Sequence, residues 1–213
     1  MTDIELVNDY LQQGKRKERL QLPDADLSNA ALAGADLNHV DLRGANFSYA
    51  DLRNADFTYA DLQGANFEGA NLTGAVFHSA TLSSSNFKNT VLTHVDFSYT
   101  KMSGINLSGL EILGCNFTSS QLIYSYLRNA DIQYCDFSKA DLSYADLSNS
   151  KLMEISFKNA QLKDAKLMSM LAVQQIIFVE AVMCNANLRD AKICADFTLA
   201  NLTRANLENA ILT

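Results

Sequence analysis

The stretch ADLRNADFTYADLQGANFEGANL, residues 50–72, is built from a five-residue unit: Ala, then Asp or Asn, then Leu or Phe, then two variable residues. From Leu22 to Leu167 every fifth residue, called the centre below, is Leu, Phe, Ile or Met without exception. Such a period gives neither a stripe on an α-helix nor one face of a flat strand. It requires a backbone that turns a corner at every unit, so that four units close one coil. The centre and the small residue two places before it then point into the coil.

This pattern resembles the pentapeptide-repeat family, whose unit is A(D/N)LXX. The resemblance covers the chain from about residue 20 to its end and implies an all-β fold, a right-handed quadrilateral parallel β-helix. We expect a solenoid of nearly ten coils, each about twenty residues long, in which every coil stacks on its neighbours. From Leu42 to Phe97 the centres alternate between Leu and Phe, which places Phe above Phe on two opposite sides. We interpret this alternation as core packing.

Two segments are expected, an N-terminal segment of residues 1–20 and the β-helix of residues 21–213. Thr2 and Glu5 have the spacing of a capping box, and apolar residues follow at helical spacing. We therefore predict a short helix over residues 3–13. It would lie over the first coil and shield a strand edge that otherwise invites pairing with another chain.

The segment VNDYLQQGKRKERL, residues 7–20, is also similar to the leader of some cyanobacterial members of the family, including one linked to heterocyst differentiation. Within it Gly14 is a natural helix stop. The run Lys15-Arg16-Lys17 is interpreted as a solvated linker, with a basic contact patch as the alternative.

The register of the repeat slips once and then recovers. After Leu167 the pattern predicts centres one residue late, at Val173, Phe178, Met183, Leu188 and Ile193, and Phe197 restores the original phase. We expect a one-residue bulge within residues 168–173 and a tightened corner near residues 193–197.

Composition excludes several classes of protein. No window of about 18 apolar residues exists, so no membrane-spanning helix is expected, and the N-terminus lacks the apolar region of a signal peptide, which predicts a cytoplasmic protein. The net charge of −7 argues against direct binding to nucleic acid. Most of the negative charge lies in the first half of the chain, and it suits a basic partner.

No catalytic, cofactor-binding or metal-binding residues are predicted, and we expect no enzyme. The frequent Asp before the centre recurs because the unit calls for Asp or Asn, which points to solvation and local backbone hydrogen bonds rather than acid–base chemistry. The four cysteines lack CxxC spacing. Cys115 and Cys135 share an inward position one coil apart, close enough for a disulfide, but in a cytosolic protein they are expected to be buried free thiols. A smooth rod without long loops should have no cleft for a small molecule.

The surface offers one suggestive feature. His39, Tyr59 and Tyr99 share the second position after the centre on one side of the rod, with Ser79 between the tyrosines, and Tyr124 and Tyr144 stack on an adjacent side. Exposed aromatic rows are favoured at protein interfaces. The candidate interaction surface consists of these aromatic residues and nearby acids: His39, Tyr59, Tyr99, Tyr124, Tyr144, Asp36, Asp41, Asp56 and Asp61.

These features favour a non-enzymatic scaffold that presents a rigid surface to a protein partner. The family resemblance adds two alternatives, a mimic of duplex DNA that binds DNA gyrase or another topoisomerase, and a regulator of cyanobacterial cell differentiation. The last coil, with Leu202, Leu207 and Leu212, is expected to pair with a second copy in an end-to-end homodimer.

Overall fold

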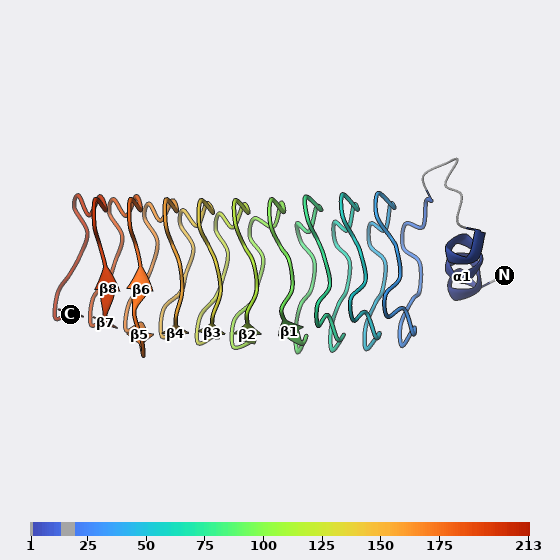
Figure 1. The fold of residues 1–213 in the computed structure, drawn as a ribbon, viewed down its shortest axis with the longest axis horizontal. Coiled ribbons are helices and arrows are strands. Elements are labelled where there is room, and N and C mark those ends of the chain that lie inside the picture. The colour runs from blue at the N-terminus through green and yellow to red at the C-terminus, as the bar shows by residue number, and fades with distance from the viewer. Residues whose placement is uncertain (1, 14–19) are drawn as a thin grey trace.

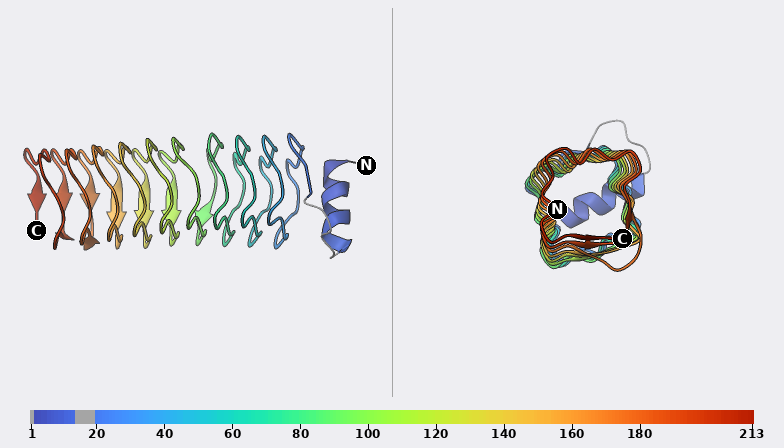
Figure 2. Two further views of the ribbon diagram at one scale, coloured as in Figure 1. Left: turned by 90° about the horizontal axis from the view of Figure 1, so that it is seen from above. Right: turned by 90° about the vertical axis from the view of Figure 1, so that its left-hand side faces the viewer.

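The computed structural model describes residues 2–13 and 20–213. From residue 21 onward the chain winds into a straight rod whose coils have four sides, and a helix lies across the N-terminal end (Figure 1). Viewed along the rod, successive coils superimpose as a square (Figure 2). The predicted right-handed quadrilateral β-helix is confirmed.

The strands are short because each side of the square takes only a few residues before the next turn. One side carries a parallel seven-stranded sheet in the order β1-β2-β3-β4-β5-β7-β9, called the strand face below, and β6 pairs with β8 on the next side. The strands are β1 Leu92–Thr93, β2 Glu111–Leu113, β3 Asp131–Gln133, β4 Lys151–Met153, β5 Leu171–Ala172, β6 Ile176–Ile177, β7 Lys192–Ile193, β8 Ala195–Asp196 and β9 Ile211–Leu212.

The seven-stranded sheet marks about six turns of the solenoid, fewer than the nearly ten that the repeats predict. Before Leu92 the coils still pair at the same spacing, but through isolated parallel bridges such as that between Gln21 and Asp41. A single bridge on each side is too short to form a strand, so the sheet underestimates the length of the ladder.

The interior follows the predicted pattern, with the centre and the small residue before it both buried. Ala75 and Phe77, for example, are completely buried. Phe rings stack continuously along one side from Phe57 to Phe197, with the rings of Phe117 and Phe137 only 4.5 Å apart and nearly parallel. We call this side the phenylalanine face. A shorter stack of Phe47, Phe67 and Phe87 lies on the opposite side.

Each regular corner has a residue in the left-handed region, two places after the centre. Tyr59 has φ of 58° there. The Asp or Asn before the centre holds the turn: Asp56 Oδ1 accepts a hydrogen bond of 2.8 Å from the Thr58 N–H. Gly114 has a second reason to be glycine, because a Cβ there would lie 2.4 Å from Nδ1 of His94 in the preceding coil. The recurring Asp residues are therefore turn-forming groups, as interpreted from the sequence.

Helix α1 spans Asp3–Gln13, which confirms the predicted bounds. Its capping box is present, since Glu5 Oε2 accepts from the Thr2 N–H at 2.8 Å and Thr2 Oγ1 accepts from the Glu5 N–H at 3.2 Å. Val7 is fully buried against the first coil. Asp3 Oδ2 also accepts the Asp26 N–H at 2.9 Å, so the helix satisfies a donor on the open edge of the first coil. The predicted stop at Gly14 and the run Lys15-Arg16-Lys17 lie outside the described residues.

The slip in register is real, but it starts later than the sequence predicts. Leu152 pairs with Ala172, at the usual spacing, so Ala172 is the centre and Val173 is 51% exposed. The next pairing joins Ser156 to Ile177, one residue further along. The bulge therefore lies in the corner of residues 173–175, which has three residues where the regular corner has two. The tightened corner is confirmed, because Cys194 alone separates Ile193 from the inward-facing Ala195.

Candidate functional site

Four aromatic rings form a continuous row along one edge of the phenylalanine face. The rings of His39 and Tyr59 stack with centroids 4.9 Å apart and an interplanar angle of 14°. Tyr59 then meets His78 edge-on at 6.0 Å, and His78 meets Tyr99 at 5.3 Å. Tyr59 and Tyr99 remain 51% and 56% exposed. We call His39, Tyr59, His78 and Tyr99 the four-ring row.

His78 is the member of this row that the sequence analysis missed. It lies one residue before Ser79, which was expected to interrupt the row, and its ring fills the gap between the two tyrosines. A hydrogen bond of 2.8 Å between His78 Nδ1 and Ser98 Oγ fixes its position. The sequence indicated this contact only through the position of His78 directly before Ser79.

Carboxylates border the row on both sides, although not all of those predicted are accessible. Asp36 and Asp56 lie in one ladder on the phenylalanine face, which continues through Val76 to Asp96 and through Asn116 to Asp136. Asp61, on the adjacent side, is half-buried, with Arg43 Nε 3.8 Å from it. Asp41 is different, and its predicted place on the surface needs correction.

Asp41 is only 6% exposed, and Arg43 covers it. Arg43 Nε donates to Asp41 Oδ1 at 2.8 Å and Nη2 donates to Oδ2 at 2.7 Å. This bidentate ion pair occupies both carboxylate oxygens of Asp41. A carboxylate paired in this way is unavailable to a partner protein. The accessible surface therefore excludes Asp41.

The second aromatic pair, Tyr124 and Tyr144, stacks as predicted, with ring centroids 4.9 Å apart and an interplanar angle of 18°. It lies on a different corner of the rod, beside Tyr126. Arg128 lies 6.0 Å above the Tyr126 ring and donates from Nε to Asp146 Oδ2 at 2.6 Å. The surroundings of this pair are thus partly basic, in contrast to those of the four-ring row.

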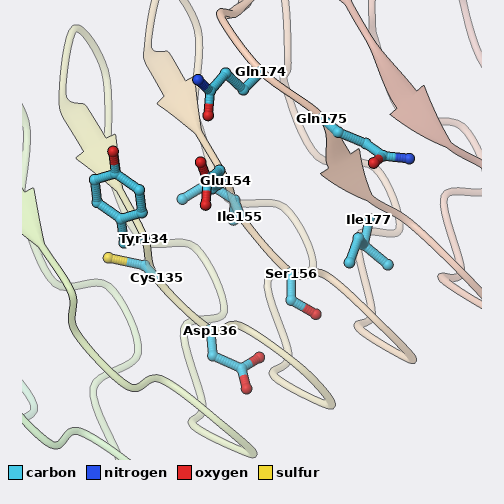
Figure 3. A pocket seen from close by; sticks show the side chains of 9 residues that line it. All are labelled: Tyr134, Cys135, Asp136, Glu154, Ile155, Ser156, Gln174, Gln175 and Ile177. Atoms are coloured by element: carbon cyan, nitrogen blue, oxygen red, sulfur yellow. The ribbon is translucent and has the colours of Figure 1, made fainter.

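The rod is not free of concavities, contrary to the sequence-based expectation. A pocket of about 610 Å³ lies where the strand face meets the phenylalanine face, beside the bulge (Figure 3). Its lining consists of Tyr134, Cys135, Asp136, Glu154, Ile155, Ser156, Gln174, Gln175 and Ile177. The extra residue in the corner of residues 173–175 makes the backbone bow outward. In the end-on view this corner is the orange-red loop that leaves the square at the lower right (Figure 2). The pocket was not predicted, because the bulge was expected only to shift the phase of the five-residue repeat.

The cysteine pair lies in the interior. Cys115 and Cys135 are both buried with free thiols, and the Cys115 N–H donates to Cys135 Sγ at 3.3 Å. The hydrogen bond with Cys135, together with burial, raises the pKa of the Cys115 thiol. Such a thiol stays protonated and unreactive at neutral pH. Among the described residues, no group of three or more His, Cys, Asp or Glu side chains is arranged to hold a metal ion.

The final coil is the most exposed part of the apolar interior. Leu207 is 40% exposed and Leu212 is 38% exposed, and Leu202 is half-buried, whereas the centres from Leu22 to Leu167 are buried. In the part of the chain that the structure describes, the only helix is α1, which is too short to cross a membrane.

Comparison with known proteins identifies sequence and structural relatives. The sequence model described as Pentapeptide repeats matches eight copies, over residues 21–58, 35–74, 50–89, 70–109, 113–149, 135–168 and 193–213. No curated protein matches the sequence closely enough to count as a relative.

Among solved structures, HetL from the cyanobacterium Nostoc sp. strain PCC 7120, a pentapeptide repeat protein involved in heterocyst differentiation regulation, is 27% identical. The match covers 99% of this chain and 94% of HetL, with a TM-score of 0.62. QnrB1, a plasmid-mediated fluoroquinolone resistance protein, is 19% identical over 92% of this chain and 90% of its own, with a TM-score of 0.32. A pentapeptide repeat protein of the Arabidopsis thaliana thylakoid lumen is 27% identical over 53% of this chain and 65% of its own, with a TM-score of 0.29. The last two similarities are too low to inform function.

Proposed function

The chain belongs to the pentapeptide-repeat family, and from that membership we propose that it is a non-enzymatic scaffold that presents the phenylalanine face of a rigid rod to a protein partner. The repeated coils hold every side chain on this face at a fixed spacing. A surface that is ordered before binding loses little conformational entropy when a partner docks.

The observation that carries the proposal is the four-ring row. Each ring contacts the next, and the two tyrosines are about half exposed. A small polar side chain would be enough at an exposed turn position, so the apolar surface of these rings needs another explanation. Tyr is enriched among the residues that dominate binding energy at protein interfaces. The carboxylates of Asp36 and Asp56 beside the row favour a partner segment rich in Arg or Lys, because opposite charges steer association.

HetL suggests the setting in which such a scaffold works. Its structural match extends over almost the whole of both chains, including the region of helix α1. On that basis we propose that the present chain is also a regulator in a cyanobacterial differentiation pathway, acting by binding another protein rather than by catalysis.

Capture experiments with row variants test the proposal. The tagged chain, its Tyr59→Ser/Tyr99→Ser variant and its Tyr124→Ser/Tyr144→Ser variant would each be used to capture proteins from a Nostoc lysate, followed by mass spectrometry. Ser suits these turns, because Ser79 and Ser84 occupy equivalent left-handed positions. A tyrosine at the centre of an interface contributes about 2 kcal/mol or more, which is about 30-fold in affinity, so the row variant, which loses two tyrosines, should bind its partner at least about 100-fold more weakly.

The second variant is the matched control, since it removes a stacked tyrosine pair from another corner. A protein retained by the wild-type chain and by this control, but lost with the row variant, would support the proposal. If the row variant captured the same proteins as the wild-type chain, the proposal would be contradicted.

We also propose that two copies pair end to end through the coil of Leu202, Leu207 and Leu212. The exposed apolar centres and the unpaired edge of β9 favour the same coil of a second copy. Light scattering should give a mass of about twice 23.5 kDa, and Leu207→Lys should return the chain to a monomer. A strictly monomeric wild-type chain at high concentration would contradict this pairing.

A further inference from the structure

The corner pocket beside the bulge has the composition of a binding site for a cationic group. Two carboxylates, Asp136 and Glu154, line it, and no Lys or Arg does so. Asp136 Oδ1 already accepts the Ser138 N–H at 2.8 Å. By contrast, Glu154 forms no side-chain hydrogen bond or ion pair with any described residue, and the same holds for Gln174 and Gln175. All three side chains are exposed, so they line the concavity as hydrogen-bonding groups that a ligand can reach.

The arrangement of these groups is set by the coils. Tyr134, Glu154 and Gln174 come from the same corner of three successive coils, and Figure 3 shows the ring, the carboxylate and the carboxamide following one another along the rod. Tyr134 is 50% exposed, so part of its ring is open to the pocket. On the other side, Ile177 of β6 is 39% exposed and offers an apolar wall.

We propose that this pocket binds the guanidinium group of an arginine side chain carried by a basic segment of a protein partner. A planar guanidinium donates two parallel hydrogen bonds to a carboxylate, which Glu154 supplies, and it packs over the face of a tyrosine ring, which Tyr134 supplies. The carboxamide oxygen of Gln174, which lies next to Glu154 in Figure 3, accepts a remaining donor. The methylene stem of an arginine would lie along Ile177.

Arginine fits these groups better than lysine. The ammonium group of lysine is a compact and strongly hydrated charge, and it lacks the planar fork that meets a carboxylate and an aromatic face together. Anions are disfavoured because the lining has two carboxylates and no cationic side chain.

The pocket also continues the surface proposed above. One ladder on the phenylalanine face runs from the level of the four-ring row to the pocket through Asp36, Asp56, Val76, Asp96, Asn116 and Asp136, and four of these six residues are carboxylates. The inference rests on the proposed scaffold function to the extent that the arginine belongs to a protein. It adds a defined anchoring point at the far end of the same face.

NMR titration of the full chain with short peptides tests this inference. The probes are acetyl-Gly-Arg-Gly-amide, the same peptide with lysine, and the same peptide with citrulline, which has the shape of arginine without its charge. The arginine peptide should shift the side-chain amide signals of Gln174 and Gln175, the lysine peptide should shift them less, and the citrulline peptide should leave them unchanged. Glu154→Gln should lower the affinity for the arginine peptide about tenfold or more. Tyr134→Leu should lower it several-fold, on the order of one cation–π contact.

Asp164→Asn is the matched control, because Asp164 occupies the same left-handed turn position on another corner. This variant should bind the arginine peptide with the affinity of the wild-type chain. The inference is overturned if the arginine peptide produces no shift at these glutamines, if the citrulline peptide binds equally well, or if Glu154→Gln has no effect. The Tyr59→Ser/Tyr99→Ser variant should bind the peptide normally. Failure of the peptide experiment alongside row-dependent capture would therefore reject the pocket and leave the scaffold proposal standing.

Discussion

Phe117→Ala is expected to lower the free energy of unfolding by about 3–5 kcal/mol, the usual range for removing a fully buried aromatic side chain. Phe117 is completely buried, and its ring stacks on Phe97 at 5.0 Å and on Phe137 at 4.5 Å. In a solenoid each coil is held mainly by its neighbours, so a cavity at this point weakens two interfaces at once. Urea unfolding followed by circular dichroism measures the loss.

Two further variants separate cavity formation from other effects. Phe117→Leu should cost about 1–2 kcal/mol, because a leucine keeps much of the volume and Leu37 already occupies a centre on the same face. Leu199→Ala, at a side chain that is 78% exposed, should change stability by less than about 0.5 kcal/mol. If Phe117→Ala were no worse than Phe117→Leu, the phenylalanine stack would not be a principal source of stability.

Most of the fold could be predicted because the period of five leaves few alternatives. An apolar centre at every fifth position fixes the corners, the inward direction and the stacking of Phe on Phe. The bulge was misplaced because the sequence pattern ranks candidate centres by hydrophobicity, which favours Val173 over Ala172. Pairing with the coil above decides the outcome: Leu152 lies beside Ala172, and the corner that follows pushes Val173 outward.

The candidate site was predicted less completely, for reasons that concern side-chain conformation. Residues twenty apart stack, so the contacts of Tyr59 with His39 and of Tyr124 with Tyr144 follow from spacing. His78 joins its row from the neighbouring position of the turn, which a strict count of twenty does not reveal. The burial of Asp41 depends on Arg43 folding back along the surface. The pocket depends on the path of a three-residue corner, which the repeat does not specify.

Two coils of one column compensate for a change of side-chain volume in the core. On the side opposite the phenylalanine face, Ala65 precedes Phe67, and two coils later in the same column Ile105 precedes Leu107. All four side chains are buried, with exposed fractions of 0–1%. The larger centre is thus accompanied by the smaller inward residue, and the smaller centre by the larger one. Close packing of the interior favours this exchange within the column, although the phenylalanine face also accommodates large pairs such as Ile155 with Phe157.

Ala65→Ile should therefore destabilise the chain by about 1–3 kcal/mol through overpacking, because the added atoms meet Phe67, which stacks on Phe47 at 5.2 Å and on Phe87 at 5.1 Å. The double variant Ala65→Ile/Phe67→Leu reproduces the pair found at Ile105 and Leu107 and should recover part of this loss. Urea unfolding of the wild type, both single variants and the double variant forms a cycle whose interaction energy should exceed about 0.5 kcal/mol in the favourable direction. Additive effects of the two substitutions would contradict this local compensation, because they would mean that positions 65 and 67 do not share one volume.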